Sequence, residues 1–87
     1  MVRWNLVSFV RRSSQRKKIL ETLDKPTTPS QVSDKTDMYL THVSRTLREL
    51  TDKGLVECLT PKERVEKYYR ITKLGRSVLN HIHKIEE

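Results

Sequence analysis

The chain has 87 residues, of which 34% are hydrophobic and 33% are charged, so it predicts one small domain with a single core. No apolar run approaches the ~20 residues that a membrane span requires, and the N-terminus lacks a long apolar segment followed by a cleavage site, so we expect a cytoplasmic protein that does not enter a membrane. The net charge of +7 at pH 7 implies a polyanionic partner such as nucleic acid.

The first twelve residues hold a large share of the apolar side chains, with Trp4, Phe9 and four aliphatic residues among them. Their spacing fits neither the helical nor the strand period cleanly. We expect a short helix here, with an extended arm as the alternative.

A second helix is predicted at about residues 14–24, with Ser13 as its N-cap and with Ile19, Leu20 and Leu23 facing inward. Five positive charges fall within eight residues around its start. They form either a solvated helix face or a set of phosphate contacts, and they are Arg11, Arg12, Arg16, Lys17 and Lys18.

The segment Thr28-Pro29-Ser30-Gln31 has the pattern of a helix start. Thr28 is the predicted N-cap, Pro29 takes the first helical position, and Gln31 closes a capping box. This helix should end near residue 35. A tight turn at Thr36-Asp37 should follow, with Asp37 in the left-handed conformation, which Asp tolerates better than most residues.

Residues 37–56 are the most informative stretch. Leu40, Val43, Leu47 and Leu50 recur at helical spacing and should face inward, and Gly54 ends the pattern. At 100° per residue from Val43, four polar side chains fall on or near the outward side: Thr41, His42, Arg45 and Arg48. Hydroxyl, imidazole and guanidinium groups can hydrogen-bond base edges or phosphates in a major groove. A solvated face on an ordinary bundle helix would explain the two arginines, but not the neighbouring turn and hairpin.

Two strands are predicted at about residues 55–60 and 67–72, joined by an exposed polar loop at 61–66. Thr72 should then cap a final helix, whose apolar positions are Leu74, Val78, Leu79, Ile82 and Ile85. This order predicts a winged helix-turn-helix, an α+β but mostly α fold with a three-helix core and a β-hairpin wing. We divide the chain into an N-terminal helix or arm (1–12), the winged domain (13–72) and a C-terminal helix (73–87).

The chain resembles archaeal and bacterial winged-helix transcriptional regulators of the MarR and ArsR type over about residues 13–79. Four stretches carry the resemblance: Thr28-Pro-Ser-Gln-Val, Leu40-Thr-His-Val-Ser-Arg-Thr-Leu-Arg-Glu-Leu, Lys53-Gly-Leu-Val-Glu-Cys-Leu and Tyr69-Arg-Ile-Thr-Lys-Leu-Gly. The resemblance implies a recognition helix at about 39–53 and a wing tip at 61–66. Tyr39 departs from the pattern, since such proteins usually place a serine cap there. It either caps poorly or reaches the DNA.

We therefore expect sequence-specific binding of double-stranded DNA and regulation of transcription, with the recognition helix in the major groove and the wing (60–67) on the backbone or in the minor groove. Bases should be contacted by Thr41, His42 and Arg45, and phosphates by Ser44, Arg48 and the helix start at Thr28. The full candidate set is Tyr39, Thr41, His42, Ser44, Arg45 and Arg48 on the recognition helix, Lys62, Arg64 and Lys67 on the wing, and Thr28, Ser30 and Gln31 at the helix start.

Two other partners remain open. Some winged helices bind protein within polymerase, replication or sorting assemblies, but such modules commonly lose the basic outward side of the third helix, which this chain retains. RNA is a weaker alternative, because the fold lacks paired aromatic residues on an open sheet.

Catalysis and metal binding have little support. The sequence has no Gly-rich phosphate loop, no carboxylate pair in an apolar setting and no nucleophile beside a base, so we expect no enzyme and no cofactor. His81, His83 and Glu86 lie on the last helix, but His81 and His83 are about 200° apart and cannot share one ion. The single Cys58 lies in an apolar run, which favours a packed thiol in a reducing compartment over a redox sensor.

Apolar residues near both ends of the chain predict a homodimer. The helix-turn-helix and hairpin can close a small core without them, which would leave an exposed patch of the kind that usually forms an interface. These residues are Trp4, Leu6, Phe9, Val10, Val78, Ile82 and Ile85. The alternative is that the N-terminal segment folds back over its own core.

Overall fold

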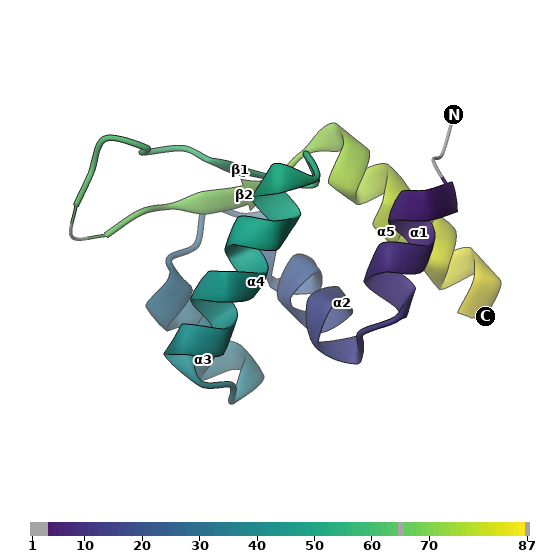
Figure 1. Cartoon of the computed structure of the whole chain (residues 1–87), viewed down its shortest axis with the longest axis horizontal. Coiled ribbons are helices and arrows are strands. Elements are labelled where there is room, and N and C mark those ends of the chain that lie inside the picture. The colour runs from purple at the N-terminus through teal and green to yellow at the C-terminus, as the bar shows by residue number, and fades with distance from the viewer. Residues whose placement is uncertain (1–3, 65, 87) are drawn as a thin grey trace.

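Five α-helices, a 3-10 turn and a β-hairpin make up residues 4–64 and 66–86, the part of the chain that the computed structural model describes (Figure 1). None of these helices is long and apolar enough to span a lipid bilayer. In chain order the elements are α1 (Trp4–Arg11), α2 (Ser14–Glu21), the 3-10 turn η1 (Thr22–Asp24), α3 (Pro29–Thr36), α4 (Leu40–Asp52), β1 (Val56–Cys58), β2 (Tyr69–Ile71) and α5 (Lys73–Glu86).

The helix ends lie close to where the local sequence predicts them. Ser13 caps α2 by accepting a hydrogen bond from the Arg16 amide, and Thr28 and Gln31 form the complete capping box at the start of α3. Asp37 has φ of 58°, the left-handed conformation expected of the turn between α3 and α4. Tyr39 precedes α4 and makes no side-chain capping bond, which agrees with the first of its two alternatives and leaves the second, a contact with DNA, as a prediction. The predicted helix over 14–24 is broken, since α2 ends at Glu21 and η1 follows it.

The hairpin is antiparallel and its regular strands are shorter than predicted. Val56 faces Ile71 and Cys58 faces Tyr69 in register. The wing, residues 56–64 and 66–71, extends beyond these pairs, because the amide of Leu59 donates to the carbonyl of Tyr68 at 2.7 Å. On its other side, β2 pairs with Thr27 through two backbone hydrogen bonds of 2.9 Å. This bridge fastens the start of α3 to the base of the wing.

A glycine allows α5 to pack tightly against the start of the wing. The nearest heavy atom to a Cβ added at Gly75 would be the carbonyl oxygen of Leu55, at 2.1 Å. Thr72 holds this junction, since its hydroxyl donates to the carbonyl of Gly54 and accepts from the amide of Gly75. Thr72 therefore caps α5, as predicted from the sequence. Gly54 has φ of 77°, which explains why a glycine follows the end of α4.

One hydrophobic core joins every helix and both strands. Its members are Leu6, Val7, Val10, Ile19, Leu20, Leu23, Val32, Val43, Leu47, Leu50, Leu55, Val56, Ile71, Val78, Leu79 and Ile82. In Figure 1, α3, α4 and the wing occupy one end of the molecule, while α1 and α5 occupy the other.

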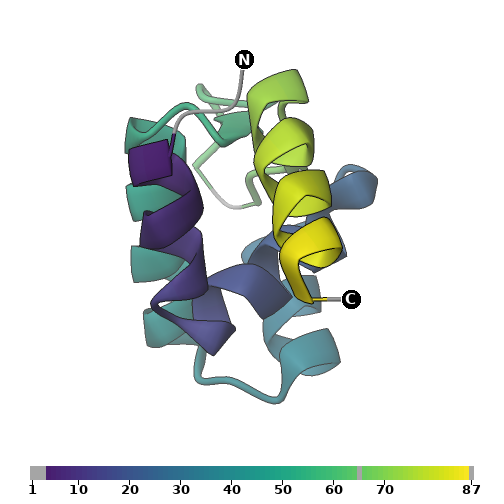
Figure 2. The same ribbon diagram turned by 90° about the vertical axis from the view of Figure 1, so that its right-hand side faces the viewer.

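The prediction that the terminal apolar residues are surplus to this core is wrong for four of the seven. Leu6 and Val10 of α1 and Val78 and Ile82 of α5 are buried within the chain itself. The two helices pack side by side, as Figure 2 shows. A domain of this size has little apolar surface to bury. The apolar residues of α1 and α5 are therefore needed to complete its core and are not left over for an interface.

Candidate nucleic-acid interface

A stripe of exposed side chains runs along α4 on the side away from Val43, Leu47 and Leu50. Five of them, spaced along one helical face, line a surface hollow of about 370 Å³: Leu40, Thr41, Ser44, Arg45 and Arg48. We call it the α4 hollow. Two guanidinium groups and two hydroxyls therefore point to the same side of one helix, as predicted from the sequence. Its fifth member, Leu40, was expected in the core.

Leu40 differs from its prediction because another residue takes its place. It is 47% exposed, whereas Met38, in the loop before α4, packs against the core. The inward stripe of α4 thus begins one turn later, at Val43.

The structure places His42 on the opposite flank of α4 from Ser44. It is half-buried, and its Nε2 atom is enclosed without a hydrogen-bond partner among the described residues. At about 100° from the inward direction, a helical residue can lie under its neighbours instead of in solvent. His42 is therefore a poor candidate for a base contact.

A second hollow, of about 280 Å³, lies where α3, α4 and the wing meet. We call it the junction hollow. It unites residues that lie far apart in the sequence: Thr28, Pro29 and Ser30 from the start of α3, Leu40 and Ser44 from α4, and Arg64, Glu66, Lys67 and Tyr69 from the wing. Five candidates from the sequence meet here, namely Thr28, Ser30, Ser44, Arg64 and Lys67.

The capping box limits what the start of α3 can offer. The Thr28 hydroxyl accepts from the Gln31 amide at 3.2 Å, and the Gln31 side chain accepts from the Thr28 amide at 3.1 Å. Thr28 is also buried, whereas Ser30 is exposed. Gln31 is exposed as well, but its side-chain oxygen is engaged in the capping box, so Ser30 is the predicted phosphate contact on this helix that is both exposed and outside the box.

Tyr69 is a member of the junction hollow that the sequence analysis assigned only to a strand. Burial, together with the neighbouring Cys58 thiol, raises the pKa of its hydroxyl above the ordinary value of 10.0. The hydroxyl is therefore protonated at neutral pH and can donate a hydrogen bond. Tyr69 lies opposite Cys58 in the strand register, which brings these two side chains together. This contact depends on how the two strands pair, so the sequence alone could not reveal it.

Besides His42 and Gln31, two more of the predicted contact residues line neither hollow. Tyr39 is 86% exposed and lines a separate hollow at the turn before α4, together with Ser33, Asp34, Asp37 and Met38. Lys62 is exposed in the loop of the wing.

Two of the five charges around the start of α2 are used within the fold. Arg16 pairs with Glu49 of α4, and Lys17 pairs with Glu86 of α5. Their positions favour internal ion pairs over phosphate contacts. Arg11, Arg12 and Lys18 are exposed.

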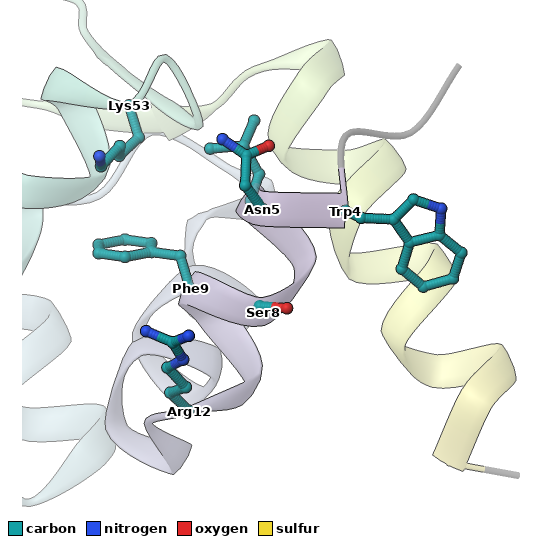
Figure 3. A pocket seen from close by; sticks show the side chains of 7 residues that line it. Trp4, Asn5, Ser8, Phe9, Arg12 and Lys53 are labelled. Atoms are coloured by element: carbon teal, nitrogen blue, oxygen red, sulfur yellow. The ribbon is translucent and has the colours of Figure 1, made fainter.

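The face formed by α1 and α5 lies at the other end of the molecule from the wing (Figures 1 and 2). Of the seven residues predicted for a dimer interface, Trp4 is 64% exposed and Ile85 is 40% exposed. Phe9 is partly buried, and in Figure 3 it extends from α1 toward Lys53 while Trp4 points away from it. The Lys53 ammonium lies 5.4 Å from the centre of the Phe9 ring.

The histidines of α5 have separate surroundings. The ring of His81 meets Trp4 edge to face with centroids 4.8 Å apart, and Nε2 of His83 lies 2.8 Å from a carboxylate oxygen of Glu21. Within residues 4–64 and 66–86, no three His, Cys, Asp or Glu side chains are grouped so as to hold a metal ion.

The fold is that of winged-helix transcription regulators. A MarR-family transcription regulator superposes with a TM-score of 0.76 at 26% identity, covering 94% of this chain and 61% of its own. A homodimeric winged helix-turn-helix DNA-binding domain from Mycobacterium bovis, a possible ArsR-family transcriptional regulator, has a TM-score of 0.68 at 28% identity, covering 92% and 71%. A mutant MarR from E. coli, solved in complex with operator DNA, has a TM-score of 0.76 at 22% identity, covering 90% and 58%.

The chain thus spans less than two thirds of the MarR regulators just described. No protein of curated function matches it in sequence. A family model described as the HVO_A0261 N-terminal domain matches residues 4–87, and the chain belongs to this family.

Proposed function

We propose that this protein binds double-stranded DNA at specific sequences and regulates transcription, with α4 as the recognition helix in the major groove. The observation that carries the proposal is the exposed stripe on α4, which presents Thr41, Arg45 and Arg48 on one side of a single helix. A B-DNA major groove is wide enough for a helix, and arginine paired with guanine is its commonest specific contact. The net charge of +7 supports a polyanionic partner.

Within this arrangement, Thr41 and Arg45 contact base edges, while Ser44 and Arg48 hold phosphates. Thr41 and Arg45 belong to the first turns of α4, where recognition helices meet base edges. Tyr39, the residue before α4, is exposed enough to reach the adjacent backbone.

The wing follows the phosphate backbone or enters the minor groove beside α4. Arg64 and Lys67 line the junction hollow together with Ser30 and Ser44, so a phosphate placed there meets two cations and two hydroxyls. Lys62 extends this positive surface along the loop. Glu66 lines the same hollow and opposes the cations, which limits the affinity.

The active form is a homodimer that joins through the α1–α5 face. Trp4 and Ile85 are large apolar side chains exposed on this face, and the M. bovis relative is homodimeric. A two-fold dimer would place two recognition helices about one DNA turn apart, near 34 Å, and would read a palindromic site.

Selection of bound fragments from random duplex DNA tests this function. We expect enrichment of one short motif, repeated as an inverted pair about 10 base pairs apart. Recovery of unenriched sequence, with retention that does not exceed that of a neutral protein, would contradict the proposal and favour a winged helix that binds protein.

A further inference from the structure

An exposed leucine begins the recognition helix. Leu40 is the first residue of α4 and is 47% exposed, although its neighbours on this surface offer hydroxyls and guanidinium groups. A single exposed leucine is common on protein surfaces, so its exposure alone carries no meaning. Its place on the interface is informative.

Leu40 lies between the two hollows that the interface presents. It lines the α4 hollow beside Thr41 and Arg45, and it also lines the junction hollow beside Ser30 and Arg64. Leu40 and Ser44 each line both hollows, so a duplex that meets both hollows at once lies next to these two side chains.

The core of the protein does not require this side chain. Val43, Leu47 and Leu50 supply the buried stripe of α4, and Met38 covers the core ahead of it. A polar residue at position 40 would therefore leave the fold intact while removing an apolar group from the interface.

The major groove contains one apolar group that matches an exposed leucine. Among the base edges of unmodified DNA, thymine carries a methyl group on C5, whereas the other edges present hydrogen-bond donors and acceptors. We propose that Leu40 packs against a thymine C5 methyl group and so selects thymine at one position of each half-site. This inference rests on the proposed function, since it places α4 in the major groove.

The partner group is a C5 methyl on a pyrimidine, which 5-methylcytosine also carries. Selection from unmodified DNA leaves thymine as its one source. Replacing each thymine of the selected duplex in turn by deoxyuridine then removes the methyl and keeps the hydrogen-bonding groups.

The test measures the dissociation constants of the full chain for these duplexes by fluorescence anisotropy. For the unchanged protein, deoxyuridine at the contacted thymine of a single half-site should weaken binding about three- to fivefold, the effect of one buried methyl group. Leu40→Ala changes both subunits of the proposed dimer, so it should lose about the square of that factor on the thymine duplex and should bind the two duplexes equally. The matched control is Leu59→Ala, another exposed leucine, which lines neither hollow. It should keep the preference for thymine.

Two results would overturn the contact while leaving DNA binding in place. One is salt-sensitive binding of the unchanged protein that is indifferent to deoxyuridine at every thymine. The other is a Leu40→Ala variant that still discriminates thymine from deoxyuridine as the unchanged protein does. Failure to bind any duplex would overturn the proposed function and this inference with it. The first measurement needs no variant, so it remains decisive even if Leu40→Ala folds poorly.

Discussion

The guanidinium group of Arg16 lies over the ring of Phe9, with 3.9 Å between Cζ and the ring centre. Its Nη1 atom also donates to the Phe9 carbonyl at 2.8 Å, and its Nε atom lies 3.8 Å from Oε1 of Glu49. One side chain of α2 thus contacts both α1 and the helix that carries the candidate interface. The placement of α4 is therefore linked to α1, which the sequence analysis treated as separable from the winged domain.

Replacing Arg16 by alanine should lower the free energy of unfolding by about 1–2 kcal/mol, because it removes a stacked cation and a charge-assisted hydrogen bond. Urea unfolding followed by circular dichroism measures this change. Lys18→Ala, an exposed position on the same helix, is the control and should have little effect. Equal losses for the two variants would show that the Arg16 contacts contribute nothing.

Gly75→Ala should destabilise the protein by about 1–3 kcal/mol, toward the upper end, because the new methyl group would press on the backbone of Leu55. Thermal unfolding measures the loss. Ser77→Ala on the exposed side of α5 is the matched control and should be neutral or slightly stabilising, since alanine favours helix. A Gly75→Ala variant as stable as the unchanged protein would mean that α5 does not pack so close to Leu55.

The local predictions succeed where neighbouring residues alone decide the structure. Thr28 and Gln31 are three residues apart and complete each other's hydrogen bonds, and Asp37 adopts the left-handed turn. Such features need no knowledge of the rest of the fold, so the sequence reveals them. The order of the helices and the hairpin follows from the same signals.

The failures concern residues whose burial depends on partners distant in the sequence. Helical spacing placed Leu40 inward and His42 outward, but both lie near the edge of the apolar stripe, where Met38 and the neighbouring elements decide which side chain is covered. Leu6 and Ile82 are apolar, which suits both a dimer interface and the core of the chain itself. Only the packing of α1 on α5 shows that they are core residues.

Arg45→Ala and Arg48→Ala should affect DNA binding in different ways. If Arg45 reads a guanine, its loss should cost about 1–3 kcal/mol on the selected site and relax the preference at that base. Loss of a phosphate contact at Arg48 should weaken binding to all sequences alike. Anisotropy titrations with the selected and a scrambled duplex measure both. Equal losses for both variants on every sequence would remove Arg45 from base recognition.

Two substitutions in the junction hollow should have opposite effects on the affinity for DNA. Arg64→Ala should weaken DNA binding because it removes a cation from the hollow, and Glu66→Gln should strengthen it because it removes an opposing charge. Both positions are exposed, so the melting temperature should be unchanged. Binding that is indifferent to both variants would show that the wing does not touch DNA.

The ion pair between Lys17 and Glu86 makes a pH-dependent contribution to stability. The hydrogen bond from Lys17 lowers the pKa of Glu86 below 4.5, and the same bond raises the pKa of Lys17 above 10.5. The contribution from Glu86 is present above pH 4.5 and is lost as the pH falls through its depressed pKa. The contribution from Lys17 is present below pH 10.5 and is lost as the pH rises through its raised pKa.

The melting temperature of Glu86→Gln should therefore lie below that of the unchanged protein at pH 7, by a small amount because both groups are exposed. The two should converge in acid below the depressed pKa of Glu86. Glu63→Gln, at an exposed position of the wing, is the control and should show no such convergence. A difference that persists unchanged in acid would rule out the ion pair as its source.

The dependence of affinity on salt tests the central proposal, that the charged partner of α4 and the wing is duplex DNA. With about six phosphates contacted, the logarithm of the association constant for the selected duplex should fall with the logarithm of salt concentration at a slope of roughly −5. The selected duplex should also stay tighter than a scrambled one at every salt concentration. A slope near zero, or equal affinity for the two duplexes throughout, would contradict sequence-specific DNA binding by this protein.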